Sequence, residues 1–181
     1  MTVSEITIRS ASSADAASLA ELAAETFPLA CPPHTTAEAI AAFIAEHFTV
    51  ARFTEYLGDA SRTLLVAEEP DGRLVGYSML IAGEPRDADA AAAVERRPTI
   101  ELSKFYTRAA AHGTRVAAPL MAATVDAASA VGAVSTWLGV NEENARAIRF
   151  YEKHGFRKVG RKHFTVGGRV EDDWVLERLL G

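Results

Sequence analysis

The stretch that decides the fold is Asn144-Ala-Arg-Ala-Ile-Arg-Phe-Tyr-Glu-Lys-His-Gly-Phe156. It predicts one short helix, because asparagine is a favoured N-cap residue and Gly155 stands where glycine commonly follows a helix end. Asn144 and Tyr151 are seven positions apart in this stretch, so their side chains lie on one face of the helix. The segment therefore predicts a capped helix that presents Asn144 and Tyr151 together.

Outward from this helix, the hydrophobic pattern alternates between strand-like and helix-like segments. We predict strands at 6–9, 63–67, 74–80, 99–107, 134–140, 159–166 and 170–179. We predict helices after the capping boxes at 12–15 and 35–38, and further helices at 49–57 and 117–130. The order is strand, helices, three strands, helix, strand, helix, two strands. It predicts one mixed α/β (α+β) domain over residues 1–181, with no internal repeat and no linker.

Residues 84–98 do not fit this alternation. They are charged and alanine-rich, carry Pro85 and Pro98 near their ends, and show no clean apolar stripe. A segment without an apolar side has little to dock against a core. We therefore expect an exposed, mobile connection with at most one helical turn.

The composition excludes several classes of protein. Hydrophobic residues make up 49% and charged residues 24% of 181, which is typical of a globular chain. The net charge of −5 argues against nucleic acid as the main partner. The chain has no apolar run long enough to span a membrane, and its first residues lack the apolar core of a signal peptide, so we expect a cytoplasmic protein.

Cysteine and histidine indicate neither a disulfide framework nor a metal site. Cys31 is the one cysteine, and no basic partner that would activate it can be placed from the sequence. The five histidines show no ligand spacing such as His-x-x-x-His. We therefore expect no metal, and we expect Cys31 to have no catalytic role.

Two segments resemble the GNAT superfamily of N-acetyltransferases. Residues 144–156 are similar to the family signature N-x-x-A-x-x-F-Y-E-K-x-G-F. Residues 100–107, followed by 112–117, stand where the family has a strand and then an acyl-CoA loop, Q/R-x-x-G-x-G/A. The N-terminal helix pair, Trp137-Leu-Gly-Val140 and the signature together are most similar to bacterial spermidine/spermine-type acetyltransferases. The resemblance implies a mixed, mostly antiparallel sheet of seven or so strands flanked by helices, splayed between the fourth and fifth strands.

The loop departs from the family pattern. The resemblance places His112 at the Q/R position, Arg115 at the first glycine and Ala117 at the last small residue, and only Ala117 fits cleanly. A helix N-terminus offers unpaired N–H groups to phosphates, and small residues let the backbone approach them. Arg115 either pairs with a phosphate or is a solvated surface residue. The implied pyrophosphate-binding residues are His112, Gly113, Thr114, Arg115, Val116, Ala117 and Ala118.

The strand and the signature helix supply the rest of the implied site. Backbone groups of Phe105, Tyr106 and Thr107 would pair with the pantetheine arm of acetyl-CoA if the sheet splays, whereas a continuous sheet would leave them no such role. Asn144 lies on the pantetheine side and is also a candidate helix cap. Tyr151 lies near the thioester sulfur, as a proton donor or merely as a packed aromatic residue.

The implied activity is transfer of an acetyl group from acetyl-CoA, the cosubstrate, to a primary amine by direct attack. Glu101 is the candidate general base, acting through water, unless it is a strand residue that faces solvent. The expected acceptor is a polyamine or similar small amine, with no nucleic acid or membrane partner, and a homodimer is left open. The alternatives are acetylation of a protein N-terminus, a lysine or an aminoglycoside-like antibiotic, or a non-catalytic protein that binds acyl-CoA.

Overall fold

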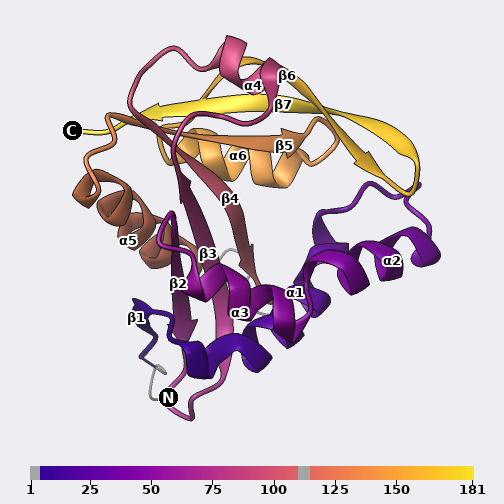
Figure 1. Cartoon of the computed structure of the whole chain (residues 1–181), viewed down its shortest axis with the longest axis vertical. Coiled ribbons are helices and arrows are strands. Elements are labelled where there is room, and N and C mark those ends of the chain that lie inside the picture. The colour runs from indigo at the N-terminus through magenta and orange to yellow at the C-terminus, as the bar shows by residue number, and fades with distance from the viewer. Residues whose placement is uncertain (1–4, 110–114) are drawn as a thin grey trace.

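A seven-stranded sheet forms the centre of the computed structural model, which describes residues 5–109 and 115–181 (Figure 1). The strand order is β1-β2-β3-β4-β5-β7-β6, and β4 and β5 are the one parallel pair among the described strands. The mixed, mostly antiparallel sheet is therefore confirmed. The strands are β1 (Thr7–Ser10), β2 (Arg62–Glu68), β3 (Leu74–Ala82), β4 (Thr99–Thr107), β5 (Ser135–Asn141), β6 (Arg157–Val166) and β7 (Arg169–Leu179).

The sheet opens between β4 and β5. Thr99–Glu101 pair with Ser135–Trp137, and beyond these three residues the two strands diverge (Figure 1). β3 remains paired with β4 as far as Thr107, so one edge of β4 is satisfied while the other faces the gap. The splay expected between the fourth and fifth strands is thus confirmed.

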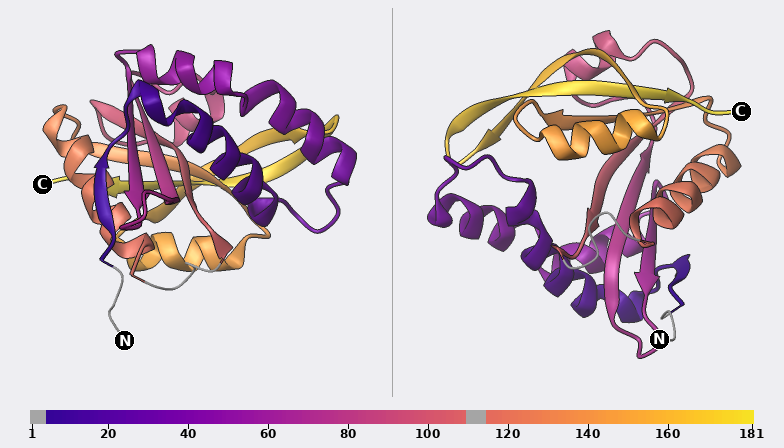
Figure 2. Two further views of the ribbon diagram at one scale, coloured as in Figure 1. Left: turned by 90° about the horizontal axis from the view of Figure 1, so that it is seen from below. Right: turned by 180° about the vertical axis from the view of Figure 1, so that it is seen from behind.

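Helices cover both faces of the sheet. A 3₁₀ turn (Ser13–Asp15) leads into α1 (Ala16–Ala30), and α1, α2 (Ala37–His47) and α3 (Val50–Gly58) lie on one face. Helices α5 (Ala117–Ala130) and α6 (Ala145–Lys153) lie on the other (Figure 2). Asn144 caps α6 through its side-chain oxygen, as its position in the sequence predicts. Thr36 and Thr49 cap α2 and α3, so α2 is capped one residue later than the box at 35–38 indicates. No helix among the described residues is long and apolar enough to cross a membrane.

A β-bulge in β4 changes which of its side chains point to each face of the sheet. Leu102 pairs with Leu80 while Lys104 pairs with Met79, so Ser103 is an extra residue on β4. Before and after the bulge, Ile100, Leu102 and Phe105 contact the core under α5 and α6. Tyr106 contacts the core under α1–α3 instead. Bulges commonly redirect side chains next to active sites. Here the bulge lies just past Glu101, the last residue of β4 that pairs with β5.

The segment at 84–98 is built differently from our expectation. It forms α4 (Ala88–Ala93), capped by the carboxylate of Asp87, and Ala90 and Val94 are buried against Trp137 and Val175. The expectation that this segment has no apolar side to dock was wrong. Two small apolar residues suffice, because α4 packs over Gly160, where an added Cβ would clash with Ala93.

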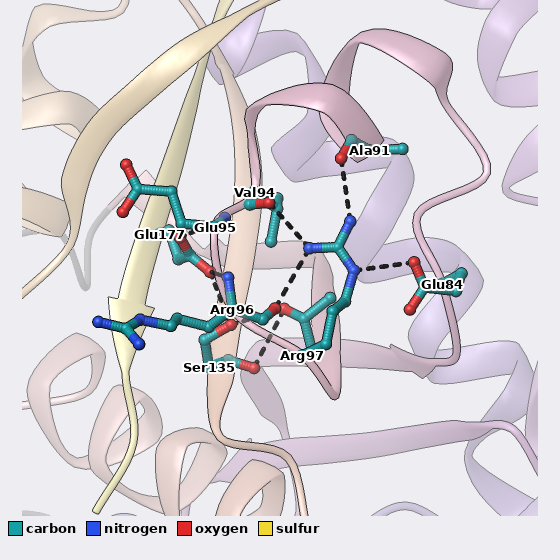
Figure 3. A network of polar contacts seen from close by, with 9 residues as sticks. Glu84, Ala91, Val94, Glu95, Arg96, Arg97, Ser135 and Glu177 are labelled. Carbon is teal, nitrogen blue, oxygen red and sulfur yellow. Dashed lines mark hydrogen bonds and ion pairs between the residues drawn. The ribbon is translucent and has the colours of Figure 1, made fainter.

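Polar contacts fix the same segment to the sheet (Figure 3). The buried carboxylate of Glu177 accepts hydrogen bonds from the backbone N–H groups of Glu95 and Arg96, at 3.0 and 3.2 Å. It also accepts one from the hydroxyl of Ser135, at 2.8 Å. The Arg97 guanidinium donates to the Glu84 carboxylate and to the carbonyls of Ala91 and Val94. A carboxylate on β7 therefore holds the chain just before it enters β4.

Candidate active site

A cavity of about 450 Å³ lies at the opening between β4 and β5. Its walls come from both sides of the splay, from α6, and from the chain around the end of α1. It brings together residues that are far apart in the sequence. The candidate site residues that line it are Glu101, Phe105, Tyr106, Thr107, Ala117, Asn144 and Tyr151.

The N-terminus of α5 lies at the same end of the cavity as Thr107, the last residue of β4. Ala117 lines the cavity, Val116 is buried, and Arg115 and Ala118 are exposed. No side chain of the described residues caps α5. Backbone N–H groups at a helix start attract anions, which favours a phosphate-binding role here. His112, Gly113 and Thr114 lie outside the described residues.

Tyr151 is half-buried in the cavity wall, and its ring packs edge-on against Phe105, Phe150 and Phe156. Its hydroxyl makes no hydrogen bond to another described residue. A purely structural tyrosine is usually buried with a partner for its hydroxyl. Burial raises the pKa of Tyr151 well above its usual range, so the hydroxyl keeps its proton.

Asn144 has the capping role and also lines the cavity. Its Oδ1 accepts a hydrogen bond from the backbone N–H of Ala147 at 3.2 Å. An amide side chain has two N–H donors as well as its oxygen. The cap therefore uses the oxygen of Asn144 and leaves the amide nitrogen as a donor.

Glu101 faces the cavity rather than bulk solvent. Burial raises its pKa, although the positive charges of Lys162 and Lys104 act in the opposite direction. Lys104 extends over the rings of Phe48 and Tyr56. Burial lowers the pKa of Lys104 to about 8, so this ammonium gives up its proton more readily than an exposed lysine.

Aromatic side chains form the wall on the α1–α2 side of the cavity. Phe27 stacks on Phe43 with ring centroids 4.7 Å apart, and Phe43 meets Phe164 of β6 edge-on at 5.6 Å. Phe43 also packs against Phe48. This wall suits the hydrocarbon part of a bound molecule.

Two buried polar atoms in the cavity wall lack hydrogen-bond partners among the described residues, Trp137 Nε1 and Asp173 Oδ1. Asp173 is 6% exposed, and its other oxygen lies 3.8 Å from Nζ of Lys162. The sequence analysis missed Asp173 and Lys162. The alternation of β6 and β7 could have shown which residues share a face, but not that this face meets Glu101.

His34 and Cys31, in the chain after α1, lie close to the cavity. Nε2 of His34 is 2.5 Å from the Glu171 carboxylate, and Nδ1 is 3.6 Å from that of Glu143. Nε2 therefore shares a hydrogen bond with Glu171, whereas the Glu143 carboxylate lies beyond hydrogen-bond distance of Nδ1. Burial raises the pKa of Cys31 to about 11, so its thiol stays protonated at neutral pH and is a poor nucleophile.

This fold and this cavity define the class of protein. The family model for the acetyltransferase (GNAT) family matches residues 17–156, and the chain belongs to that family. It is an N-acetyltransferase.

Three individual proteins resemble this chain over nearly its whole length. An uncharacterized N-acetyltransferase of Mycobacterium tuberculosis is 46% identical over 166 residues, covering 92% of this chain and 98% of the relative. The PaiA N-acetyltransferase of Thermoplasma acidophilum, solved with coenzyme A, has a TM-score of 0.76 at 20% identity, covering 97% of this chain and 99% of that one. YncA of Salmonella typhimurium, solved with acetyl-CoA, has a TM-score of 0.64 at 23% identity, over 98% and 95% of the two chains. At these identities the two solved structures show a shared fold.

Proposed function

We propose that this protein acetylates a primary amine of a small molecule, and that the acceptor is a polyamine or a similar small amine. The observation that carries the proposal is the cavity between β4 and β5. Towards the end of β4 it reaches the start of α5, and on the other side of the sheet it is lined by carboxylates and aromatic rings. It therefore has one side for acetyl-CoA and another for an amine.

The cosubstrate would lie along the edge of β4 that faces the gap. Backbone groups of Phe105, Tyr106 and Thr107 would pair with the pantetheine arm, as an open sheet edge does with an added strand. The amide nitrogen of Asn144 would donate to the same arm. The pyrophosphate would lie at the start of α5, among residues 112–118, and Arg115 is exposed there for contact with a phosphate.

The chemistry requires a neutral amine and a protonated leaving group. Glu101 would take a proton from the acceptor ammonium through a water molecule. The amine nitrogen then attacks the thioester carbon, and backbone N–H groups near Tyr106 and Thr107 stabilise the negative oxygen. The carbon–sulfur bond breaks, the acetyl group stays on nitrogen, and Tyr151 donates its proton to the sulfur of CoA. The nitrogen loses its surplus proton, which returns to the Tyr151 oxygen through water, and Glu101 releases its proton to solvent.

A panel of amines tests this proposal, with release of the CoA thiol followed by a thiol reagent. The panel should include spermidine, a peptide with a free N-terminus, lysine and an aminoglycoside. We expect the fastest release with a small polyamine. Faster turnover of the peptide or the aminoglycoside would overturn the acceptor assignment. Calorimetric binding of acetyl-CoA without turnover of any amine would indicate a non-catalytic acyl-CoA-binding protein instead.

A further inference from the structure

We propose that Asp173 binds a second, non-reacting ammonium group of the acceptor, so that the site selects molecules with two separated amines. The inference rests on the proposed function and deepens it. It assigns a specificity role to a residue of β7 that no part of the acetyl-CoA site uses.

Neither oxygen of the Asp173 carboxylate has a hydrogen-bond donor among the described residues. Oδ1 is buried and has no hydrogen-bond donor among the described residues. Oδ2 has only the Lys162 ammonium at 3.8 Å, which is longer than a hydrogen bond. A buried carboxylate oxygen without a donor is costly. The terminal torsion of an aspartate is soft, so a small rotation would present this oxygen to a ligand N–H group.

A strand position without a side chain, Gly139, lies beside this carboxylate. Gly139 of β5 is exposed and lines the cavity next to Asp173. A Cβ at this position would lie 3.4 Å from Asp173 Oδ2 and 3.1 Å from Cδ of Lys162. The absence of a side chain at Gly139 therefore lets the Lys162 side chain lie against β5 beside Asp173, and a ligand ammonium would take the place of the Lys162 ammonium there. Phe164 and Phe43 form an apolar wall close by, which suits an alkyl chain.

Asp173 and Glu101 lie at different levels along β5. Glu101 pairs with Trp137, at the last point where β4 and β5 are joined. Asp173 pairs with Asn141, four residues further along β5. The Asp173 carboxylate reaches back over Gly139, two residues from Trp137. At about 3.3 Å per residue, it lies roughly 7 Å along the strand from the level of Glu101. A molecule that meets both carboxylates must carry two amines separated by several carbon atoms.

The charges around Asp173 set the pH range of this contact. Lys162 on β6 favours its ionised form, whereas Glu171 and Asp172 on β7 oppose it, and Tyr106 on β4 lies near enough to interact with it. Burial is the largest influence and raises the pKa of Asp173 to about 6. Asp173 is therefore ionised above about pH 6, and the contact with a cation should weaken as the pH falls through that value.

The test compares diamines with monoamines of equal length. For wild type at pH 8, we expect kcat/KM for cadaverine to exceed that for pentylamine. In Asp173→Asn this ratio should fall about 10- to 100-fold, the usual effect of losing a charge-assisted contact. The loss should appear in the KM for the diamine, while the KM for acetyl-CoA and the rate with pentylamine change little.

Asp172→Asn is the matched control, because Asp172 is the neighbouring aspartate, is exposed and pairs with His163. It should leave the ratio unchanged. Lys162→Gln should raise the preference for the diamine, since it removes a competing cation. A wild type that does not distinguish the two amines, or an Asp173→Asn variant with an unchanged ratio, would overturn the inference.

A binding measurement separates this inference from the catalytic proposal. Calorimetry of the protein saturated with CoA should detect cadaverine, with binding at least about 10-fold weaker in Asp173→Asn. Binding with this pattern but no acetyl transfer would support the Asp173 contact and reject the activity. No binding of cadaverine to wild type would reject the contact.

Discussion

At the residue scale, Tyr151 offers the sharpest test of the proposed chemistry. Tyr151→Phe removes a proton donor and keeps the ring that packs against Phe105 and Phe156. General acids contribute about 10²- to 10⁴-fold in rate. We expect a loss near about 10²-fold in kcat, because a CoA thiolate is a fairly good leaving group and the raised pKa of Tyr151 makes it a weak acid.

The same variant separates a catalytic Tyr151 from a structural one. If the hydroxyl acts in the reaction, the acetyl-CoA Kd and the melting temperature should stay close to wild type while kcat falls. If Tyr151 only packs, kcat should stay near wild type while stability falls slightly. An unchanged kcat under conditions in which the chemical step limits the rate removes Tyr151 from the mechanism.

Glu101 makes a prediction about pH. Protonation of Glu101 should abolish its action as a base, and its raised pKa brings this loss to a higher pH than for an ordinary glutamate. With a monoamine acceptor, log kcat/KM should rise with slope one below the pKa of Glu101. Above that pKa it should level off, because ionised Glu101 then takes the proton from the bound ammonium.

Glu101→Gln should lower kcat/KM by about 10²- to 10⁴-fold and leave slope one at all acidic pH values. Tyr151→Phe is the control, since it should keep the wild-type profile of slope one followed by a plateau. A Glu101→Gln profile with the wild-type shape would assign the base elsewhere in the cavity.

At the scale of elements, the ends of the helices were predicted best, from capping residues and from a glycine at a helix end. The cap at Asn144 and the positive-φ Gly155 lie where the sequence predicts them, and the caps at Thr36 and Thr49 lie within one residue of the predicted helix starts. These signals act within one turn of helix and can be seen in a single segment. The docking of 84–98 could not be foreseen, because the groups that hold it come from Glu177 and Gly160, more than sixty positions downstream.

Glu177 should therefore control the order of the chain around α4. Glu177→Ala leaves two backbone N–H groups without an acceptor, and unpaired buried groups cost about 1–3 kcal/mol each. We expect a melting temperature several degrees lower and faster trypsin cleavage after Arg96. Glu95→Ala, which removes an exposed pair with Arg157, should change neither. Equal trypsin resistance in the two variants would contradict this role.

The start of α5 makes a prediction about acetyl-CoA. Ala118→Glu places a negative charge in the first turn of α5, where it stabilises the helix but repels a phosphate. The acetyl-CoA Kd should rise at least about 10-fold with no loss of stability. Ala122→Glu, also exposed and one turn further along, is the control and should bind normally. Similar affinity in the two variants would place the phosphates elsewhere.

At the scale of the whole molecule, the two sides of the cavity differ in how far the sequence reveals them. The acetyl-CoA side follows from two segments, the strand at 99–107 and the helix after Asn144, which are close in the chain. The acceptor side joins α1, α2, β4, β6 and β7, so its residues come from both ends of the sequence. Long-range pairing of β5 with β7 decides that Asp173 and Glu101 share a cavity, and no local pattern encodes that register.

The gap between β4 and β5 also bears on how each catalytic cycle ends. In the proposed complex, the arm along β4 and the phosphates at α5 belong to acetyl-CoA and to CoA alike, and only the small acetyl group differs. Product should therefore hold the same contacts as substrate and leave slowly. We expect CoA to inhibit competitively against acetyl-CoA, with an inhibition constant within a few-fold of the acetyl-CoA Kd, as initial rates at several CoA concentrations would show. Turnover would then follow the ratio of acetylated to free CoA rather than the amount of acetyl-CoA alone.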